Sequence, residues 1–344
     1  MLKILTITFI MLFGYESASV ANEATLAPGM VNPGYHDTPG WFKESFLDLR
    51  EDVKEATEAK HRVMLYFYQD GCPYCAKLIQ DNFGQKSIAD KTRQHFDVIA
   101  MNIWGDREVV DMAGLASTEK SFAKSLRVQF TPTLLMLDEK GEVVLRLNGY
   151  TPPNKFAAAL DFAGGRMEKQ QRFTDYLAAN IKEPASGKLH SEPWLLKHPL
   201  KLAPAKKGGK PLLVLFEQKE CAACDEIHTE AFVRPDVLAL LRKFQVAQVD
   251  LASHEKLWTP AGDELSARDW ARKLGVFYTP SLVYFDSNGH EVFRVEGYLR
   301  PFHLASALDY VASGAYRSQP EFQRFIEARA AAMREKGEQV DIMN

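Results

Sequence analysis

The chain has 344 residues, of which 46% are hydrophobic and 25% are charged, and its formal net charge is -3. This length is enough for two hydrophobic cores of ordinary domain size. A nearly balanced charge without clustered basic residues excludes a general nucleic-acid surface, so we expect no nucleic acid among the partners.

Residues 1–21 are typical of a signal peptide. One lysine precedes an apolar run over residues 4–13, and small residues follow up to Ala21, with Ser19 in the small-residue position before the expected cut. The run is too short to cross a bilayer, which takes roughly 20 residues. We therefore expect a soluble, exported, periplasmic protein with no stable membrane anchor after cleavage. An uncleaved N-terminal anchor is the alternative.

The next part of the chain predicts alternating strands and helices. Short apolar runs indicate buried strands, and helical spacing with Pro73 just inside its start indicates the first helix. The predicted order is strand, helix, strand, helix, hairpin and helix, over residues 62–68, 73–83, 96–103, 119–128, 133–147 and 152–163. Such an order gives a mixed sheet flanked by helices.

The second half of the chain repeats the first at an offset of 148 or 149 residues. The stretches that agree are 129–150 with 278–298, 156–162 with 304–310, and 170–181 with 319–330. We therefore predict an α/β protein with two tandem domains, over residues 22–182 and 211–344. A linker rich in Pro, Lys and Gly joins them over residues 183–210, and an amphipathic helix ends the second domain.

All four cysteines lie in two C-x-x-C pairs, each at the junction between the first strand and the following helix: Cys72 with Cys75, and Cys221 with Cys224. A helix N-terminus offers unpaired N–H groups and the positive end of the macrodipole, which both favour a thiolate. We therefore expect Cys72 at or beside the N-cap, exposed and activated. Cys75, one turn further on, should be more sheltered.

Three functions are open to these pairs. A structural disulfide between residues three apart closes a very short loop, so it adds little stability through loop entropy. A four-cysteine zinc site normally has roughly 15 to 20 residues between its pairs, whereas 145 residues separate these. Thiol–disulfide exchange is favoured, with Cys72 and Cys221 attacking, Cys75 and Cys224 resolving, and neither metal nor cofactor expected.

A Thr-Pro dipeptide precedes each hairpin, as Thr131-Pro132 and Thr279-Pro280, with the prolines 60 and 59 residues after the leading cysteine. In this combination the chain resembles a tandem of thioredoxin-fold domains, in which a cis-proline faces the C-x-x-C. More narrowly it is similar to periplasmic SoxW-type thioredoxins, through PGWFKESFLDLREDVKEA, YFYQDGCPYC and GYLRPFHLASALDYVASGAYRSQPEFQRFIEAR.

The resemblance implies a thiol–disulfide oxidoreductase that reduces protein disulfides, for example in sulfur-oxidation carriers or maturing cytochromes. A membrane thiol reductase would supply its electrons. The substrate backbone would pair as an added strand with the residues before the prolines. The resemblance thus assigns substrate binding to Thr131, Pro132, Thr279 and Pro280, together with Pro73 and Tyr74. As an alternative, the second pair would form a module that binds copper or docks a partner.

The chain departs from thioredoxin at the position of its buried aspartate. Six residues before the leading cysteines stand Tyr66 and Leu215. Glu217 is at best a substitute in the second half, and we expect it to be a solvated charge at a strand end. For His228, four residues after Cys224, we expect a place on the surface or in helix packing.

Overall fold

The structure is a computed structural model that describes residues 37–182, 184–202, 209–276 and 278–340. The expected signal peptide lies outside these residues. Within the described part of the chain, no helix is both long and apolar enough to cross a membrane.

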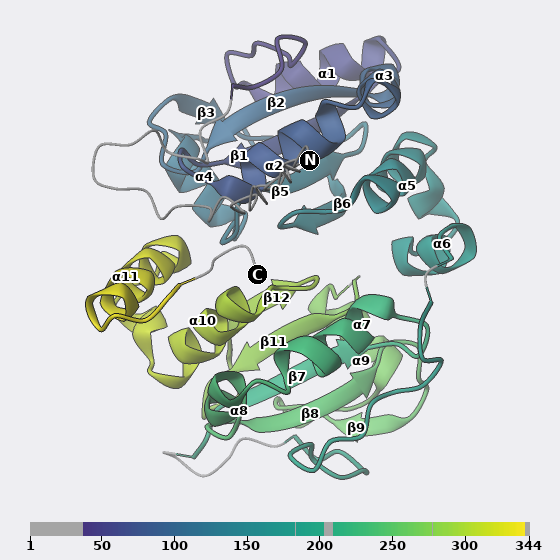
Figure 1. The fold of residues 1–344 in the computed structure, drawn as a ribbon. Helices are drawn as coiled ribbons and strands as arrows, with labels where there is room; N and C mark the ends of the chain where they lie inside the picture. The colour runs from purple at the N-terminus through teal and green to yellow at the C-terminus, as the bar shows by residue number, and fades with distance from the viewer. Residues whose placement is uncertain (1–36, 183, 203–208, 277, 341–344) are drawn as a thin grey trace, which may run out of the picture. The chain divides into compact units, whose positions relative to one another are not determined.

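The first repeat is a four-stranded mixed sheet with helices on both faces (Figure 1). The strand order is β2-β1-β5-β6, with β1 parallel to β2 and antiparallel to β5. Its elements are α1 (Leu49–Glu58), β1 (Arg62–Tyr68), α2 (Pro73–Leu78), α3 (Lys86–His95), β2 (Phe96–Asn102), β3 (Glu108–Val110), β4 (Ala116–Thr118), α4 (Glu119–Ser125), β5 (Thr133–Leu137), β6 (Val143–Asn148), α5 (Pro153–Gly164) and α6 (Phe173–Asn180).

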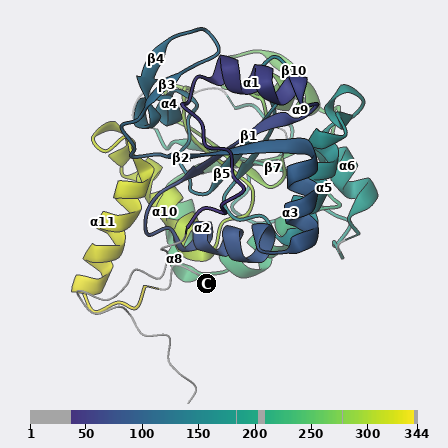
Figure 2. The same ribbon diagram turned by 90° about the horizontal axis from the view of Figure 1, so that it is seen from above.

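Strand β1 is buried on both faces, which explains its almost unbroken apolar sequence. Successive side chains point to opposite faces of a strand. Met64 and Tyr66 therefore join one core cluster with residues of α2, α3 and α5, whereas Leu65 and Phe67 join another with residues of α1 and α4. In Figure 2, α1 and α4 accordingly lie on one side of β1 and β2, and α2 and α3 on the other.

The second repeat has the same topology, with strand order β12-β11-β7-β8 and the same pattern of parallel and antiparallel pairs. Its elements are β7 (Leu212–Glu217), α7 (Ala222–Glu226), α8 (Pro235–Leu241), β8 (Gln245–Asp250), β9 (Lys256–Trp258), β10 (Glu264–Ser266), α9 (Ala267–Leu274), β11 (Ser281–Phe285), β12 (Glu291–Glu296), α10 (Pro301–Ala312) and α11 (Phe322–Glu335). The predicted pair of mixed sheets flanked by helices is confirmed.

The predicted helix over 73–83 is α-helical only to Leu78 and continues as a π-helical turn over Ile79–Phe83. The second repeat has the same feature over Ile227–Ala231. Helices α1 and α3 were not predicted. Both helices are mostly polar, and each buries only a few side chains: Leu49, Asp52, Val53 and Ala56 in α1, and Ile88 and Thr92 in α3.

Part of the expected linker packs on the second repeat. Leu200 and Leu202 are 1% and 3% exposed and belong to a core cluster with residues of β7 and β8. The backbone N–H of Leu196 donates to the carbonyl of Val246 at 2.8 Å. Apolar residues of the expected linker thus contribute to the core of the second repeat.

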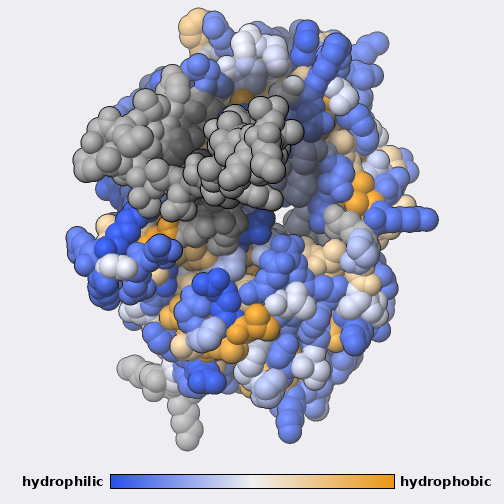
Figure 3. Space-filling model, in the orientation of Figure 1, coloured by the Kyte–Doolittle hydropathy of each residue, from blue (hydrophilic) through white to orange (hydrophobic). Residues whose placement is uncertain are grey.

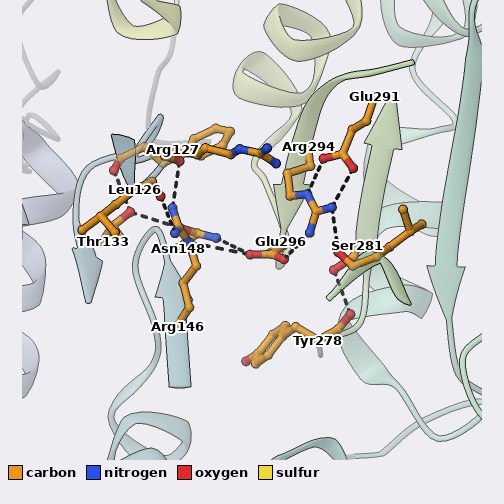
Figure 4. A network of polar contacts seen from close by, with 12 residues as sticks. Leu126, Arg127, Thr133, Arg146, Asn148, Tyr278, Ser281, Glu291, Arg294 and Glu296 are labelled. Atoms are coloured by element: carbon orange, nitrogen blue, oxygen red, sulfur yellow. Dashed lines mark hydrogen bonds and ion pairs between the residues drawn. The ribbon is translucent and has the colours of Figure 1, made fainter. Parts of the chain in front are cut away.

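The edge strands β6 and β12 carry equivalent arginines (Figure 4). Arg146 donates to the carbonyl of Leu126 at 2.8 Å, and Arg294 donates to that of Leu274 at 2.9 Å. Each arginine thus ties its edge strand to the end of the preceding helix. Asn148 Nδ2 also donates to Glu296 Oε2 at 2.8 Å.

The predicted C-terminal helix is α11, whose buried residues Phe322, Ile326 and Ala330 join the core of the second repeat. A spacing of four residues places these three side chains on one face of the helix. On the molecular face drawn in Figure 3, the second repeat is largely hydrophilic with scattered hydrophobic groups.

Candidate active site

Each C-x-x-C pair lies where the first strand of its repeat meets a helix. Cys72 and Cys221 are the N-cap residues of α2 and α7. The sulfur atom of each leading cysteine accepts a hydrogen bond at 3.1 Å from the backbone N–H of the second, Cys75 or Cys224. The predicted N-cap position is confirmed. A thiolate at Cys72 or Cys221 would gain from this donor and from the helix dipole.

Both pairs are disulfides in this structure, with Cα atoms 5.2 Å apart in each. The two cysteines of each pair are thus close enough to form and break a bond with one another. The arrangement allows reversible dithiol–disulfide chemistry twice in one chain.

The expected exposure of Cys72 is wrong. Cys72 is 3% exposed and Cys221 8%, and only the second cysteines follow the expectation, Cys75 at 0% and Cys224 at 3%. Cys72 belongs to a core cluster with Phe42 and other aromatic residues. The reason is tertiary packing, which a position at a helix N-terminus does not reveal.

The Thr131–Pro132 and Thr279–Pro280 peptide bonds are cis, as the resemblance implied. Thr131 lies beside the first pair, because its carbonyl oxygen is 3.3 Å from Cys72 Sγ. In the second repeat, Thr279 Oγ1 donates to Gln218 Oε1 at 3.2 Å, which ties Thr279 to the segment just before Cys221.

Pro73 and Tyr74, between the cysteines of the first pair, lie in the first turn of α2. Proline is favoured there because its missing N–H would have no partner within the helix. The ring of Tyr74 meets the ring of His303 of α10 edge-on, with centroids 5.4 Å apart. Burial lowers the pKa of His303 to about 4, so this imidazole is neutral at neutral pH. The first pair therefore has an aromatic and uncharged neighbour.

The expectation that Glu217 is a solvated charge is wrong. This last residue of β7 is 1% exposed, and its carboxylate accepts from Gln248 Nε2 at 2.7 Å and lies 3.0 Å from His228 Nε2. His228 is itself 2% exposed, so it packs inside the repeat rather than on its surface. Six residues before Cys221, where thioredoxin has its aspartate, Leu215 is buried in the core.

Asp225, next to Cys224, is held by three hydrogen bonds. Ser186 N and Oγ donate to it at 2.6 and 2.7 Å, and His190 Nε2 lies 2.6 Å away. Burial acts to raise the pKa of Asp225, but these partners outweigh it and the pKa lies below its usual value. The next residue, Glu226, behaves oppositely: burial raises the pKa of its carboxyl.

Sequence reasoning missed the polar cluster of Glu217, Gln248, His190 and Glu192 around His228. The available signal was weak: a glutamate at the end of an otherwise apolar strand and a histidine four residues after Cys224. The partners lie 11 and 31 residues from Glu217, and only the fold brings them together.

A cavity of about 1090 Å³ lies elsewhere, along β6 and β12, and Arg146 and Arg294 are among its lining residues. None of the four cysteines lines it. The cysteine pairs are therefore the better candidate for chemistry, although large pockets are the usual first choice.

Comparisons with known proteins identify the domain family. The family model of the thioredoxin-like domain matches residues 49–164 and 199–312, which is once in each repeat. A comparison with curated protein sequences gives no significant match.

Several solved structures are each similar to about a third of this chain. A thioredoxin-fold protein from Helicobacter pylori is 28% identical over 36% of this chain and 83% of its own, with a TM-score of 0.32. A thioredoxin from Thermus thermophilus is 23% identical over 33% and 81%, with a TM-score of 0.27. A protein described as DsbH oxidoreductase is 12% identical over 38% and 92%, with a TM-score of 0.29.

Proposed function

Because the chain belongs to the thioredoxin-like domain family and is a thiol–disulfide oxidoreductase with a C-x-x-C pair in each repeat, we propose that it reduces disulfide bonds of exported proteins in the periplasm. The signal-peptide pattern of residues 1–21 supports this location. The resemblance to SoxW-type thioredoxins supports the reducing direction and substrates among sulfur-oxidation carriers or maturing cytochromes.

The observation that carries the proposal is the setting of Cys72. Its sulfur accepts the Cys75 N–H at 3.1 Å and lies 3.3 Å from the carbonyl oxygen of Thr131. The N–H stabilises a thiolate, and the backbone at Thr131 offers a place beside the sulfur where a substrate strand can pair. The sulfur proposed to attack and the backbone proposed to bind the substrate are thus neighbours, which supports the proposal.

Exchange proceeds in two steps. The Cys72 thiolate attacks one sulfur of the substrate disulfide, an S–S bond forms between them, and the other substrate sulfur leaves as a thiolate that takes up a proton. Cys75 then loses its proton and attacks Cys72 Sγ. The mixed disulfide breaks, the second substrate thiol is released, and two electrons have passed from the protein to the substrate. A membrane thiol reductase is proposed to return the protein to its dithiol form.

For the second pair we propose the same chemistry in a relay that passes electrons to the first. The disulfide between Cys221 and Cys224 is one of the two states that exchange requires, which supports this chemistry at the second pair.

Trapping tests the proposal. In cells that express Cys75→Ser, attack by Cys72 without resolution should leave covalent adducts with periplasmic proteins on non-reducing gels. The matched control is the double variant Cys72→Ser/Cys75→Ser, in which the adducts should disappear. If Cys72 alkylates readily in Cys75→Ser but no adducts form, the proposed substrate role of the first pair is wrong.

Thiol trapping of the wild-type protein in the same cells tests the direction. A reductase is expected to hold its pairs mainly as dithiols at steady state. Pairs that are mainly oxidised would contradict the reducing role while leaving the exchange chemistry intact.

A further inference from the structure

Two histidines and a glutamate converge beside the second C-x-x-C. His190, Glu192 and His228 each offer one donor atom, and these atoms all lie within 4.8 Å of one another. His228 lies in the π-helical turn after α7, whereas His190 and Glu192 precede β7. The exchange steps described above use none of the three.

His228 is held in one orientation. Its Nε2 lies 3.0 Å from the buried carboxylate of Glu217, which also accepts from Gln248. The other nitrogen, Nδ1, is buried and has no hydrogen-bond partner among the residues that the structure describes. When Nε2 carries the proton that binds Glu217, Nδ1 presents a lone pair. Leaving such an acceptor buried and unsatisfied is unfavourable.

That lone pair faces another acceptor. Glu192 Oε1 is 3.5 Å from His228 Nδ1. In a tetrahedral zinc site with bonds of about 2.0–2.2 Å, neighbouring donor atoms lie about 3.4 Å apart. The separation of these two atoms therefore already fits a shared cation.

His190 completes the set. Asp225 binds its Nε2 at 2.6 Å, which leaves Nδ1 for a further ligand. Its ring lies parallel to that of His228, with an angle of 7° and centroids 4.4 Å apart. A common ion requires a rotation of one ring, because both imidazoles must point a nitrogen at the same metal. We expect His190 to rotate, since it lies in an irregular segment with its side chain 20% exposed, whereas the side chain of His228 is 1% exposed.

We propose that His190, Glu192 and His228 bind one divalent transition-metal ion of the zinc type. Two imidazoles and one carboxylate are a known zinc donor set and leave a fourth position for water. Glu217 and Asp225 would act as the carboxylates that orient metal-binding histidines through their other nitrogen. The site lies beside the second cysteine pair but does not depend on the proposed reductase function.

The equivalent position in the first repeat lacks this chemistry. At the offset of 149 residues that aligns the leading cysteines, Ile79 stands for His228 and Tyr68 for Glu217. The proposal therefore predicts one ion per chain, bound by the second repeat alone.

Calorimetric titration of the untagged full-length mature protein with Zn²⁺ tests the site. Both cysteine pairs are kept oxidised, so that no thiolate can bind the metal. We expect one ion per chain. His190→Ala and Glu192→Gln should each weaken binding at least about tenfold. The matched control is His290→Ala, because His290 is 79% exposed and pairs with Asp286 at 3.7 Å; it should bind as the wild type does.

Titration with Co²⁺ adds a spectroscopic readout, since a tetrahedral site gives visible absorption that His190→Ala should abolish. Circular dichroism checks that each variant folds. Absence of stoichiometric binding, or binding that both variants retain, would overturn the proposal.

Discussion

The first strand of each repeat buries one charged side chain, but at opposite ends. Arg62 opens β1, is 2% exposed, and donates to the carbonyl of Ala163 at 2.5 Å and to the carboxylates of Glu139 and Glu168. Glu217 closes β7, next to the segment that leads to Cys221. Strand β1 therefore places its buried charge at the end away from its cysteine pair, whereas β7 places its buried charge at the end near its cysteine pair.

Strand pairing extends this contrast. Tyr66 pairs with Ala100 in the first sheet, and Leu215 pairs with Gln248 in the second. Ala100 is therefore the counterpart of Gln248, which donates to Glu217. The two repeats share one topology. The first cysteine pair has apolar and aromatic neighbours, whereas the second has a hydrogen-bonded cluster of charged and amide groups beside it. The two pairs are expected to differ in chemistry although their backbones agree.

The largest loss of stability is expected when Arg62 is replaced. Arg62→Met removes the partner of two partly buried carboxylates and of a buried carbonyl, so the free energy of unfolding of the first repeat should fall by about 3–4 kcal/mol. Hydrogen exchange of β1 and β7 amides measures this loss for each repeat separately. Arg93→Met, at a 59% exposed side chain 3.9 Å from Asp90, should cost less than about 0.5 kcal/mol. Equal losses in the two variants would mean that the buried network adds nothing.

A somewhat smaller loss of stability is expected when Glu217 is replaced. Glu217→Leu leaves His228 Nε2 and Gln248 Nε2 buried without an acceptor, which should cost the second repeat about 2–3 kcal/mol. The triple variant Glu217→Leu/His228→Ile/Gln248→Ala gives the cluster an apolar character like that of the first repeat and should recover most of this stability. Urea unfolding compares the two. A triple variant no more stable than the single one would show that packing, not hydrogen bonding, decides the difference.

His303 provides a pH test beside the first pair. Because burial lowers its pKa to about 4, below the usual value of about 6.5, the unfolded chain takes up the proton first as the pH falls. Its contribution is complete above about pH 6.5 and is lost between pH 6.5 and 4. The wild type should lose about 2 kcal/mol more than His303→Gln between pH 7 and 5. Urea unfolding at both pH values measures this.

His290→Gln is the matched control for this pH test, since His290 is 79% exposed on the surface of the same repeat. This variant should show the same pH dependence as the wild type. If His303→Gln also keeps the wild-type dependence, the imidazole is not kept neutral by burial.

The smallest expected effect is a difference in pKa between the leading thiols of the two pairs, Cys72 and Cys221. The second pair is followed by Asp225, whose pKa lies below its usual value, so a carboxylate stays ionised beside it. Negative charge disfavours a thiolate, so we expect the pKa of Cys221 to exceed that of Cys72. Alkylation rates against pH, on reduced Cys72→Ser/Cys75→Ser and Cys221→Ser/Cys224→Ser proteins, give both values. A pKa at Cys221 equal to or below that of Cys72 would show that the hydrogen bonds to Asp225 cancel its influence.

The sequence alone predicted the duplication, the order of the main strands and helices, and the place of each C-x-x-C at a strand-to-helix junction. These properties depend on local patterns: the apolar run of residues 62–68, the proline at the start of α2, and a repeat offset that can be counted. The place of each Thr-Pro dipeptide before a hairpin could also be predicted from the sequence. Such features need no knowledge of which distant residues touch.

Only the tertiary structure decided the surroundings of the cysteines. Cys72 is enclosed because aromatic residues from separate segments pack around it. Glu217 is buried rather than solvated because β8 brings Gln248 beside it and the turn after α7 brings His228. A charged residue at a strand end is normally solvated. Its burial becomes favourable only when partners distant in sequence supply hydrogen bonds, and strand register and helix placement determine those partners.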